Sequence, residues 1–527
     1  MNLVHILDCT LRDGGYCNQW MFGFDNSKKI VKGLIESNVE IIECGFITDR
    51  VDFNKNITKY NQVNQISSLI PKNREGKLFV AMINYGEYDI DNLPEHDGCS
   101  VDGIRVAFSK KNVKEALAFC KAIKEKGYLV FIQAMVSLSY SDDEFLNMIH
   151  EVNQFEPYAF YIVDSFGMMK EKDLTRLFYM VEHNLNKNIW IGFHSHNNMQ
   201  LAFSNAQKLT TIQTNRNIII DSSIFGMGRG AGNLNTELFE EYLNENFSKN
   251  YRVKPIFTLI DEIINEFYQR NYWGYSLPNY ISASHNAHPN YAGYLDDKKT
   301  LTFEDMNAIF DFMSDDKKIS FDKNYIEELY LQYLNAGKEH EQHKSELYNK
   351  LKNKKILLIG PGKSSVDEKD KIIAFANDPS VSVISINFDY DYFESDFIFI
   401  SNIRRFKELG VKHKVRCITT SNLHAKGVYY QTKYADLLND EDGVRDNAVL
   451  MAIKFLIKMG IKEIYLAGID GYSHDVDENY GKDEMTIFSK NNVLDVMNKG
   501  ISKVLSQFSK EVSINFLTKP KYVSLEL

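Results

Sequence analysis

The sequence predicts a (β/α)₈ barrel over about its first 230 residues and a second, smaller α/β domain toward its C-terminal end. The main observation is a series of eight short, almost continuous apolar runs, which are typical of strands buried on both faces of a parallel sheet. Amphipathic stretches between them, such as residues 27–37, 111–126 and 171–185, predict the intervening helices. The eight runs are LVHIL (3–7), VEIIECGF (39–46), KLFVAMI (77–83), GIRVAF (103–108), YLVFIQAM (128–135), YAFYIV (158–163), IWIGF (189–193) and NIIID (217–221).

The alternative architecture for this region is an open, doubly wound sheet. That fold predicts a glycine-rich loop directly after the first strand. Residues 8–15 instead read DCTLRDGG and place charged side chains inside the turn. The barrel is therefore the better prediction.

We expect three segments along the chain: the barrel at 1–250, a mostly helical extension at 251–340 and a Rossmann-like α/β domain at 341–527. The extension carries a polar, aromatic insert at 271–294. A charged stretch at 337–355 predicts a connecting helix. A second series of apolar runs then begins, with a helix expected at 445–460; the runs lie at 354–360, 381–388, 396–401, 415–420 and 462–470.

Composition narrows the class of protein. The chain has 61 Lys and Arg against 71 Asp and Glu, a net charge of −10, which argues against a nucleic-acid or anionic-membrane binder. Its six cysteines form no CxxC pair, so we expect reduced thiols and a cytoplasmic protein. No apolar run is long enough for a signal peptide or a membrane span.

Polar residues at the ends of the runs mark the expected active site, because a barrel of this kind carries its chemistry at the carboxyl ends of its strands. His194 and His196 are two positions apart, so they point the same way on a strand and can grip one metal ion together. A carboxylate after the first strand would complete a site for Mn²⁺, Mg²⁺, Co²⁺ or Zn²⁺. The other strand-end residues are Asp8, Glu43, Arg105, Gln133, Asp164 and Asp221.

Three motifs resemble a known family. LDCTLRDGG (7–15), GFHSHNN (192–198) and GMGRGAGNLNTE (226–237) are similar to the metal-dependent pyruvate aldolases related to 4-hydroxy-2-oxovalerate aldolase. The wider superfamily includes hydroxymethylglutaryl-CoA lyase and the isopropylmalate and homocitrate synthases. The resemblance covers about residues 1–300.

This resemblance implies roles for particular residues. Asp13, His194 and His196 would bind the metal, and Asn233 is a further ligand in some members of the family. Arg12 would stabilise the enolate that forms when the bond next to the carbonyl of a chelated 2-oxo acid, such as pyruvate, is made or broken. We also expect a homo-oligomer.

One position departs from the family pattern. The aldolases carry a histidine base three residues after the metal aspartate, where this chain has Tyr16. Tyr16 could act as a base only with a strongly lowered pKa or through a water, so His285, His288 and Tyr291 in the insert are better candidates. Glu43 and Asp164 are expected to orient other groups. The glycines of 226–233 predict a tight turn near the metal, with a phosphate-binding role near Arg229 as the alternative.

The second domain offers a weaker signal. ILLIGPGKSS (356–365) is neither a Walker A motif nor a full GxGxxG. With SINFD (385–389) and IYLAGIDGYS (464–473), it resembles the nucleotide-binding fold of bacterial sialyltransferase-like proteins. The candidate nucleotide or nucleotide-sugar residues are Gly360, Gly362, Asn387 and Asp470. The alternative is a degenerate domain used for assembly or docking.

The sequence therefore predicts a divalent-metal-dependent aldolase that acts on pyruvate and an aldehyde. The paired domains favour a sugar-derived aldehyde and the synthesis of an unusual sugar for a polysaccharide. Two alternatives stay open: an acyl-CoA-dependent Claisen-type synthase, and a non-catalytic scaffold with a nucleotide-binding domain.

Overall fold

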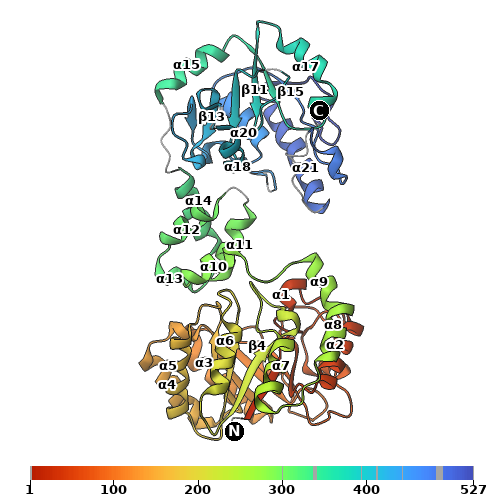
Figure 1. Cartoon of the computed structure of the whole chain (residues 1–527), viewed down its shortest axis with the longest axis vertical. Coiled ribbons are helices and arrows are strands. Elements are labelled where there is room, and N and C mark those ends of the chain that lie inside the picture. The colour runs from red at the N-terminus through yellow and green to blue at the C-terminus, as the bar shows by residue number, and fades with distance from the viewer. Residues whose placement is uncertain are drawn as a thin grey trace. The chain divides into compact units, whose positions relative to one another are not determined.

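The computed structural model describes residues 3–298, 301–335, 341–392, 394–410, 413–441, 443–481 and 491–525 (Figure 1). Contacts divide the chain into two compact units. The first unit holds Met1–Asp297 and Met306–Asp322, and the second holds Lys298–Asp305 and Lys323–Leu527. This division after Asp322 precedes the one expected at residue 340, and the three-segment division stays a prediction.

The first unit is a closed barrel of eight parallel strands. Around the ring the order is β1-β9-β8-β7-β6-β5-β4-β2, and pairing of β1 with β2 closes it. The fold prediction is confirmed, because an open sheet would leave β1 and β2 unpaired with each other. The strands are β1 (Leu3–Asp8), β2 (Ile41–Ile47), β4 (Leu78–Asn84), β5 (Gly103–Phe108), β6 (Leu129–Ala134), β7 (Ala159–Asp164), β8 (Trp190–Ser195) and β9 (Asn217–Ser222), with the two-residue β3 (Lys59–Tyr60) beside β2.

Each strand buries both of its faces. Neighbouring residues on β1 show this: Leu7 belongs to an apolar cluster of strand side chains that includes Phe131, whereas Ile6 belongs to a larger cluster shared with helix residues such as Leu34. Successive side chains on a strand point to opposite faces. The apolar runs are thus continuous because one face fills the barrel and the other packs under the helices.

Helices surround these strands (Figure 1). The sequence starts α4 sharply, because Ser141 and Glu144 form a capping box at its first turn. The helices of this layer are α2 (Phe24–Ser37), α3 (Val113–Glu125), α4 (Asp142–Phe155), α5 (Glu171–Asn184), α6 (Ala202–Thr211), α7 (Thr236–Phe247) and α8 (Val253–Leu259).

The helical extension follows as α9 (Asn265–Arg270), α10 (Leu277–Ser284), α11 (Pro289–Asp297), α12 (Phe303–Asp311) and α13 (Asp315–Lys318). It belongs to the first unit except for residues 303–305 at the start of α12. His288, just before α11, places its ring edge-on to Phe166 at 5.5 Å between centroids. Phe166 follows β7, so this part of the extension lies over the carboxyl end of the barrel.

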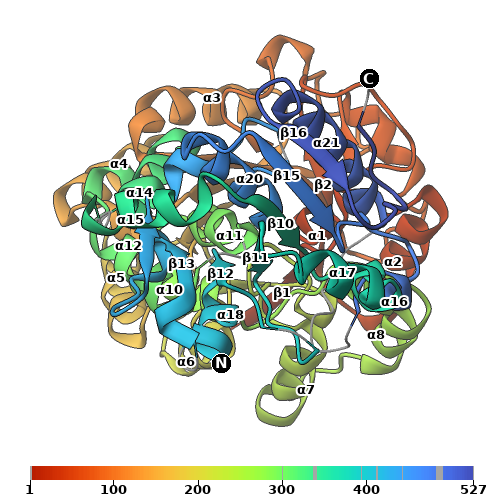
Figure 2. The ribbon, with the colours of Figure 1, turned by 90° about the horizontal axis from the view of Figure 1, so that it is seen from above.

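The second unit contains a seven-stranded parallel sheet in the order β14-β13-β12-β11-β10-β15-β16 (Figure 2). Its connections reverse direction between β10 and β15, at the type of switch point where α/β sheets bind ligands. The two outermost strands, β14 (Tyr430–Thr432) and β16 (Ser513–Phe516), did not stand out in the sequence because they are short and interrupted by polar residues. The others are β10 (Lys355–Ile359), β11 (Val381–Ile386), β12 (Phe397–Ile400), β13 (Cys417–Thr420) and β15 (Glu463–Ala467).

The helices of the second unit include α14 (Lys323–Asn335), α15 (Glu341–Leu351), α16 (Ser364–Asp367), α17 (Lys369–Ala376), α18 (Ile403–Arg405), α20 (Ala448–Lys458) and α21 (Asn491–Phe508). α15 covers most of the predicted connecting stretch, but Leu347 and Leu351 are buried, so this helix also packs on its own unit. Within the described ranges, no helix has both the length and the apolar composition needed to cross a membrane.

Candidate active site at the barrel mouth

Asp13, His194 and His196 meet at the carboxyl end of the barrel. Asp13 lies in the turn between β1 and α1 (Gly15–Asn18), His194 is on β8 and His196 follows it directly. All three are buried, and one ligating atom from each lies within 4.8 Å of the others. The i, i+2 spacing of the histidines thus has the predicted effect of presenting both rings to one point.

The donor atoms of this cluster fit a divalent cation. His194 shares a 2.9 Å hydrogen bond between Nδ1 and Asp221 Oδ2, which leaves its Nε2 free for a ligand. His196 Nδ1 lies 3.8 Å from Asp13 Oδ2 and is buried without a hydrogen-bond partner in the described part of the chain. Asn233 donates from Nδ2 to Asp13 Oδ2 at 2.8 Å, and its Oδ1 is likewise buried and unpartnered. Imidazole and carboxylate are ligands that such ions accept.

Electrostatics keep these groups in the protonation states that a cation needs. Burial alone would raise the pKa of Asp13, but the Arg12 guanidinium and the two imidazoles together hold that pKa well below its usual range. Burial lowers the pKa of His196 to about 3, an effect that Asp13 opposes and Arg229 reinforces. At neutral pH the carboxylate is therefore ionised and the imidazole keeps a lone pair.

Arg12 is held beside this cluster by two carboxylates. Its Nε donates to Glu43 Oε2 at 2.8 Å, and its Nη1 donates to Asp13 Oδ1 at 2.5 Å. Trp20 Nε1 donates to the Arg12 carbonyl at 2.7 Å, which fixes the backbone as well. Arg12 Nη2 is buried and has no partner among the described residues. The guanidinium is thus oriented in advance, with one nitrogen left to bind something else.

A buried arginine links the two halves of the site. Arg105, on β5, donates from Nη1 to Glu43 Oε2 at 2.7 Å and from Nη2 to Asp221 Oδ2. The same carboxylates orient Arg12 and His194, so Arg105 connects these two predicted site residues. The sequence marked Arg105 and Asp221 as strand-end residues but gave no sign of this pairing.

Asp164, which was also expected to orient other groups, has a different role. Asp164 accepts from the backbone N–H groups of Met168 and Met169, both at 3.0 Å, so it shapes the loop after β7. At the glycine turn, a Cβ on Gly228 would come within 2.3 Å of Asn233 Nδ2 and 2.7 Å of Asp13 Oδ2. This contact gives the glycine a packing role next to the cluster.

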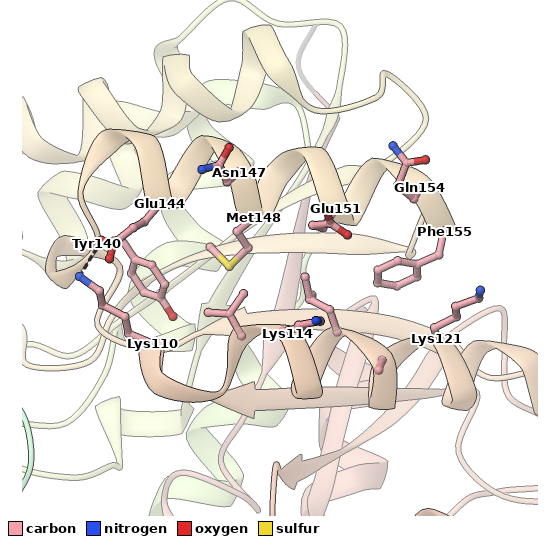
Figure 3. Close-up of a pocket in the computed structure, with 13 residues that line it drawn as sticks. Lys110, Lys114, Lys121, Tyr140, Glu144, Asn147, Met148, Glu151, Gln154 and Phe155 are labelled. Atoms are coloured by element: carbon pink, nitrogen blue, oxygen red, sulfur yellow. Dashed lines mark ion pairs between the residues drawn. The ribbon is translucent and has the colours of Figure 1, made fainter.

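The cluster opens into a cavity of about 60 Å³. Five predicted site residues line it, together with Arg229 and Gln133: Arg12, Asp13, Tyr16, His194 and His196. A larger hollow of about 670 Å³ lies between α3 and α4 (Figure 3). Its lining consists mainly of helix side chains, including Leu117, Met148 and the Lys110–Glu144 ion pair, and none of the predicted site residues is among them. We therefore place the candidate chemistry in the smaller cavity.

Tyr16 does not have the lowered pKa that a phenolate base requires. Tyr16 is 42% exposed, but desolvation by the groups around it still raises its pKa, although the guanidinium of Arg229, 5.7 Å from the ring centre, opposes this effect. At neutral pH its hydroxyl therefore stays protonated and can donate a hydrogen bond. This shift depends on tertiary packing, which the sequence does not show.

The three candidates from the insert lie outside the cavity lining. His285 Nε2 is 3.0 Å from Asn307 Oδ1. The Tyr291 hydroxyl is buried against the carbonyls of Lys317 and Ser320, at 2.8 and 2.7 Å. These contacts favour structural roles for both residues.

His288 is the candidate that lies nearest the site by its contacts. Its ring packs on Phe166, and burial together with the charge of Arg229 lowers its pKa to about 3. Asn290 donates its backbone N–H to His288 Nδ1 at 3.2 Å.

The nucleotide-site candidates of the second unit are spread over two places. Gly362 and Asp470 line a cavity of about 50 Å³ beside the switch point. Gly360 packs against the turn after β15, where a Cβ would come within 2.7 Å of the Gly468 carbonyl oxygen. Asn387 lies outside this lining and accepts from the Ser401 backbone N–H at 3.1 Å.

The glycine turn after β10 already uses most of its own donors. The Gly362 N–H donates to the Gly468 carbonyl at 2.8 Å, and the Ser364 N–H donates to Asp470 Oδ2 at 2.8 Å. A phosphate cradle needs such N–H groups to be free. Two of the donors of this turn are therefore already paired within the protein, and nucleotide binding stays a prediction.

Comparisons with known proteins agree with the motifs. Residues 3–250 match the HMGL-like family. The 4-hydroxy-2-oxovalerate aldolase of Pseudoalteromonas translucida is 26% identical over 243 residues, which are 46% of this chain and 70% of that enzyme. The enzyme of the same name from Geobacillus genomosp. 3 is 27% identical over 245 residues, with the same two coverages.

A solved structure is also similar to this region. The N-terminal domain of a candidate aldolase from Bacteroides vulgatus is 28% identical, covers 57% of this chain and 98% of that one, and superposes with a TM-score of 0.48. The resemblance of the barrel to pyruvate aldolases of the HMGL-like superfamily, predicted from three motifs, is confirmed by the family match and the related sequences.

Proposed function

We propose that the first unit is a divalent-metal-dependent aldolase that makes or breaks a carbon–carbon bond through a pyruvate-type enolate. The observation that carries this proposal is the buried Asp13, His194 and His196 cluster beside the fixed guanidinium of Arg12, in a cavity at the barrel mouth. The related sequences named 4-hydroxy-2-oxovalerate aldolase support the reaction class. The paired domains favour a sugar-derived aldehyde as the second substrate.

Asp13, His194 and His196 would hold the cation, with Asn233 Oδ1 available as a fourth ligand. When bound, a divalent cation supplies Lewis-acid polarisation of a 2-oxo acid. Asp221 fixes the His194 ring so that Nε2 faces outward from the hydrogen bond. The ligand set is therefore assembled before any substrate arrives.

Arg12 acts on the charge that develops during the reaction. An enolate concentrates negative charge on the former carbonyl oxygen, and Arg12 Nη2 is the buried donor left free to bind it. Glu43 and Asp13 hold the guanidinium, so little reorganisation is needed when the charge appears. Arg suits this task because it stays protonated throughout.

Two residues are proposed as hydrogen-bond donors at the aldehyde end. Tyr16 keeps its proton and donates to a substrate oxygen. His288 has a neutral ring close to Arg229, and its Nδ1 accepts from the Asn290 N–H, so its Nε2 carries the proton and we propose it as the second donor. A His288→Gln enzyme that cleaves its aldol at the wild-type rate would remove this residue from the mechanism.

The decisive experiment is exchange of the pyruvate methyl protons in D₂O, followed by NMR. Protein reloaded with Mn²⁺, Mg²⁺, Co²⁺ or Zn²⁺ is compared with metal-free protein, and paramagnetic metal is removed before detection. We expect metal-dependent exchange that His194→Ala abolishes and that the exposed, matched control His150→Ala retains.

Two other results would point elsewhere. Bound metal without exchange would favour the acyl-CoA-dependent synthase, which release of free CoA from a thioester would then identify. Failure to bind any of the four metals would favour the non-catalytic scaffold.

For the second unit, we propose a nucleotide or nucleotide-sugar site in the cavity lined by Gly362, Asp470 and Tyr472. Its place beside the switch point supports the proposal. Saturation-transfer NMR with a panel of nucleoside mono- and diphosphates tests it. Signals that Asp470→Asn leaves unchanged would place any binding outside this cavity.

A further inference from the structure

Arg229 lies at the barrel mouth but has no role in the proposed reaction. It lies in the glycine turn after β9, is half-buried, and lines the same cavity as Arg12, Asp13 and the two histidines. Its Nη2 donates to the Ser165 carbonyl at 2.8 Å, which fixes the guanidinium on the loop after β7. Arg229 is therefore built into the site.

Among the described residues, no carboxylate forms an ion pair with the Arg229 guanidinium, although the Arg229 backbone N–H donates to Asp13 Oδ2 at 3.4 Å. The other buried or half-buried arginines of the first unit each pair with a carboxylate. They are Arg12, Arg74, Arg105 and Arg216. In the part of the chain that the structure describes, no salt bridge involves the guanidinium of Arg229, whose neighbours are the Ser165 carbonyl and the Tyr16 ring. A charge held in a partly desolvated cavity is costly unless an opposite charge joins it.

The charges of the cavity show which ligand could join it. Asp13 is the one carboxylate in the described lining, and it already serves Arg12 and the two histidines. Pyruvate brings a single negative charge, which a bound divalent cation would offset. A second anion is therefore needed to match Arg229, and the remaining substrate is the aldehyde.

We propose that Arg229 binds an anionic group, a carboxylate or a phosphate, on the acceptor aldehyde, so that the enzyme selects charged aldehydes over neutral ones. The proposal rests on the proposed aldolase function. The guanidinium presents several N–H donors to such a group in a planar fork, and one of them is already held by Ser165. The Tyr16 ring lies against this guanidinium, and Tyr16 lines the same cavity, where its hydroxyl is a further hydrogen-bonding group.

The test compares aldehydes that differ in charge. Condensation with pyruvate is measured for succinic semialdehyde against butanal, and for glyceraldehyde 3-phosphate against glyceraldehyde. A charge-assisted contact predicts a preference of about 10- to 100-fold in kcat/KM for the charged member of at least one pair. The pair that shows the preference identifies carboxylate or phosphate as the recognised group.

The readout for each variant is this ratio, so that a general loss of activity cancels. We expect Arg229→Met to bring the ratio close to one, Arg229→Lys to keep most of the preference, and the exposed control Arg252→Met to leave it unchanged. Recovery of the preference in Arg229→Lys also shows that the charge, and not the fold of the turn, is responsible.

Pyruvate proton exchange, measured on the same preparations without aldehyde, separates the two proposals. Absence of exchange in the wild type would overturn the aldolase function itself. With exchange intact, the Arg229 proposal is overturned if neutral aldehydes react as well as charged ones, if no aldehyde of either pair reacts, or if Arg229→Met keeps the preference. It is also overturned if Arg229→Met mainly raises the KM for pyruvate in the exchange assay, because Arg229 would then hold the pyruvate carboxylate.

Discussion

Both units of this protein bring the carboxyl ends of parallel strands to a small cavity, but they treat the polar groups there differently. At the barrel mouth, Arg12 Nη2, His196 Nδ1 and Asn233 Oδ1 are buried and have no partner in the described chain. At the switch point of the second unit, Asp470 accepts from the Ser364 N–H and hydroxyl, at 2.8 and 2.5 Å. In the first site these buried polar atoms are unpaired, whereas in the second site the polar groups of the turn pair with one another.

This contrast teaches how to weigh the two sequence signals. Buried polar groups are normally satisfied, because an unpaired one costs about 1–3 kcal/mol. Two of them, on Arg12 and His196, face the lining of one cavity and therefore indicate a ligand-binding site. The second unit has the glycines and the topology of a binding site, but these glycines are explained by the close approach of two turns. Each prediction below tests one side of this contrast.

The largest effect is expected at Arg12. Arg12→Met removes the free Nη2 donor that we assign to the enolate oxygen, and loss of one such donor typically slows a reaction by about 10²- to 10³-fold. Pyruvate exchange in D₂O, at saturating Mn²⁺, measures the effect. An exchange rate within a few-fold of wild type would mean that the unpartnered nitrogen has no role in the reaction.

The next effect is expected at Asp221, which touches His194 but not the cavity. Asp221→Asn weakens the hydrogen bond that orients the His194 ring, and changes of this kind typically reduce metal affinity by about 10- to 100-fold. Titration with Mn²⁺ followed by electron paramagnetic resonance checks it. Asp143→Asn, on the exposed first turn of α4, is the matched control and should bind Mn²⁺ as the wild type does.

Two glycine substitutions compare the units directly. Gly362→Ala would place a Cβ 2.6 Å from the Gly468 carbonyl oxygen, so we expect the second unit to lose about 1–3 kcal/mol of stability while pyruvate exchange continues. Gly228→Ala would press on Asn233 and Asp13, and should weaken metal binding.

Scanning calorimetry resolves the transition of the second unit, and Mn²⁺ titration reports on the first. If Gly362→Ala left the calorimetric transitions unchanged, the packing explanation of this turn would be wrong. The glycine would then be free for a ligand, as the sequence predicts.

The fold was predictable because its signals are local. Eight continuous apolar runs identified the barrel strands, whereas β14 and β16 were missed because three or four residues with polar members carry no such pattern. The histidine pair and Asp13 were predictable from spacing and motif. The Arg105 links to Glu43 and Asp221 were not, because they depend on the register of strands far apart in the sequence.

Protonation states were also beyond the sequence. Tyr16 takes the family's histidine position, but partial desolvation, which only the folded structure shows, raises its pKa and leaves it a donor. In the same way, the proposal for Arg229 rests on the lack of an ion-pair partner for its guanidinium among the described residues, and such a lack has no sequence signature.

The smallest effect tests whether unpartnered groups away from a cavity affect stability alone. Glu240, on α7, is buried; it accepts from the Ser37 hydroxyl at 2.5 Å, and its Oε2 has no partner in the described residues. Burial raises its pKa to about 8, with further contributions from Asp8, Glu237 and Glu40. The folded state thus binds this proton more tightly than the unfolded state does.

The free energy of unfolding should therefore be highest, as far as Glu240 affects it, at low pH. It should fall as the pH rises toward 8, by up to about 1.4 kcal/mol per pH unit. Glu240→Gln should remove this slope between pH 6.5 and 8, while the exposed neighbour variant Glu241→Gln keeps it. Urea unfolding followed by tryptophan fluorescence measures it, because all three tryptophans, Trp20, Trp190 and Trp273, lie in the first unit. Unchanged pyruvate exchange in Glu240→Gln would confirm that a buried unpartnered group affects function here only where it faces the cavity. A loss of exchange would show that such a group affects function away from the cavity as well.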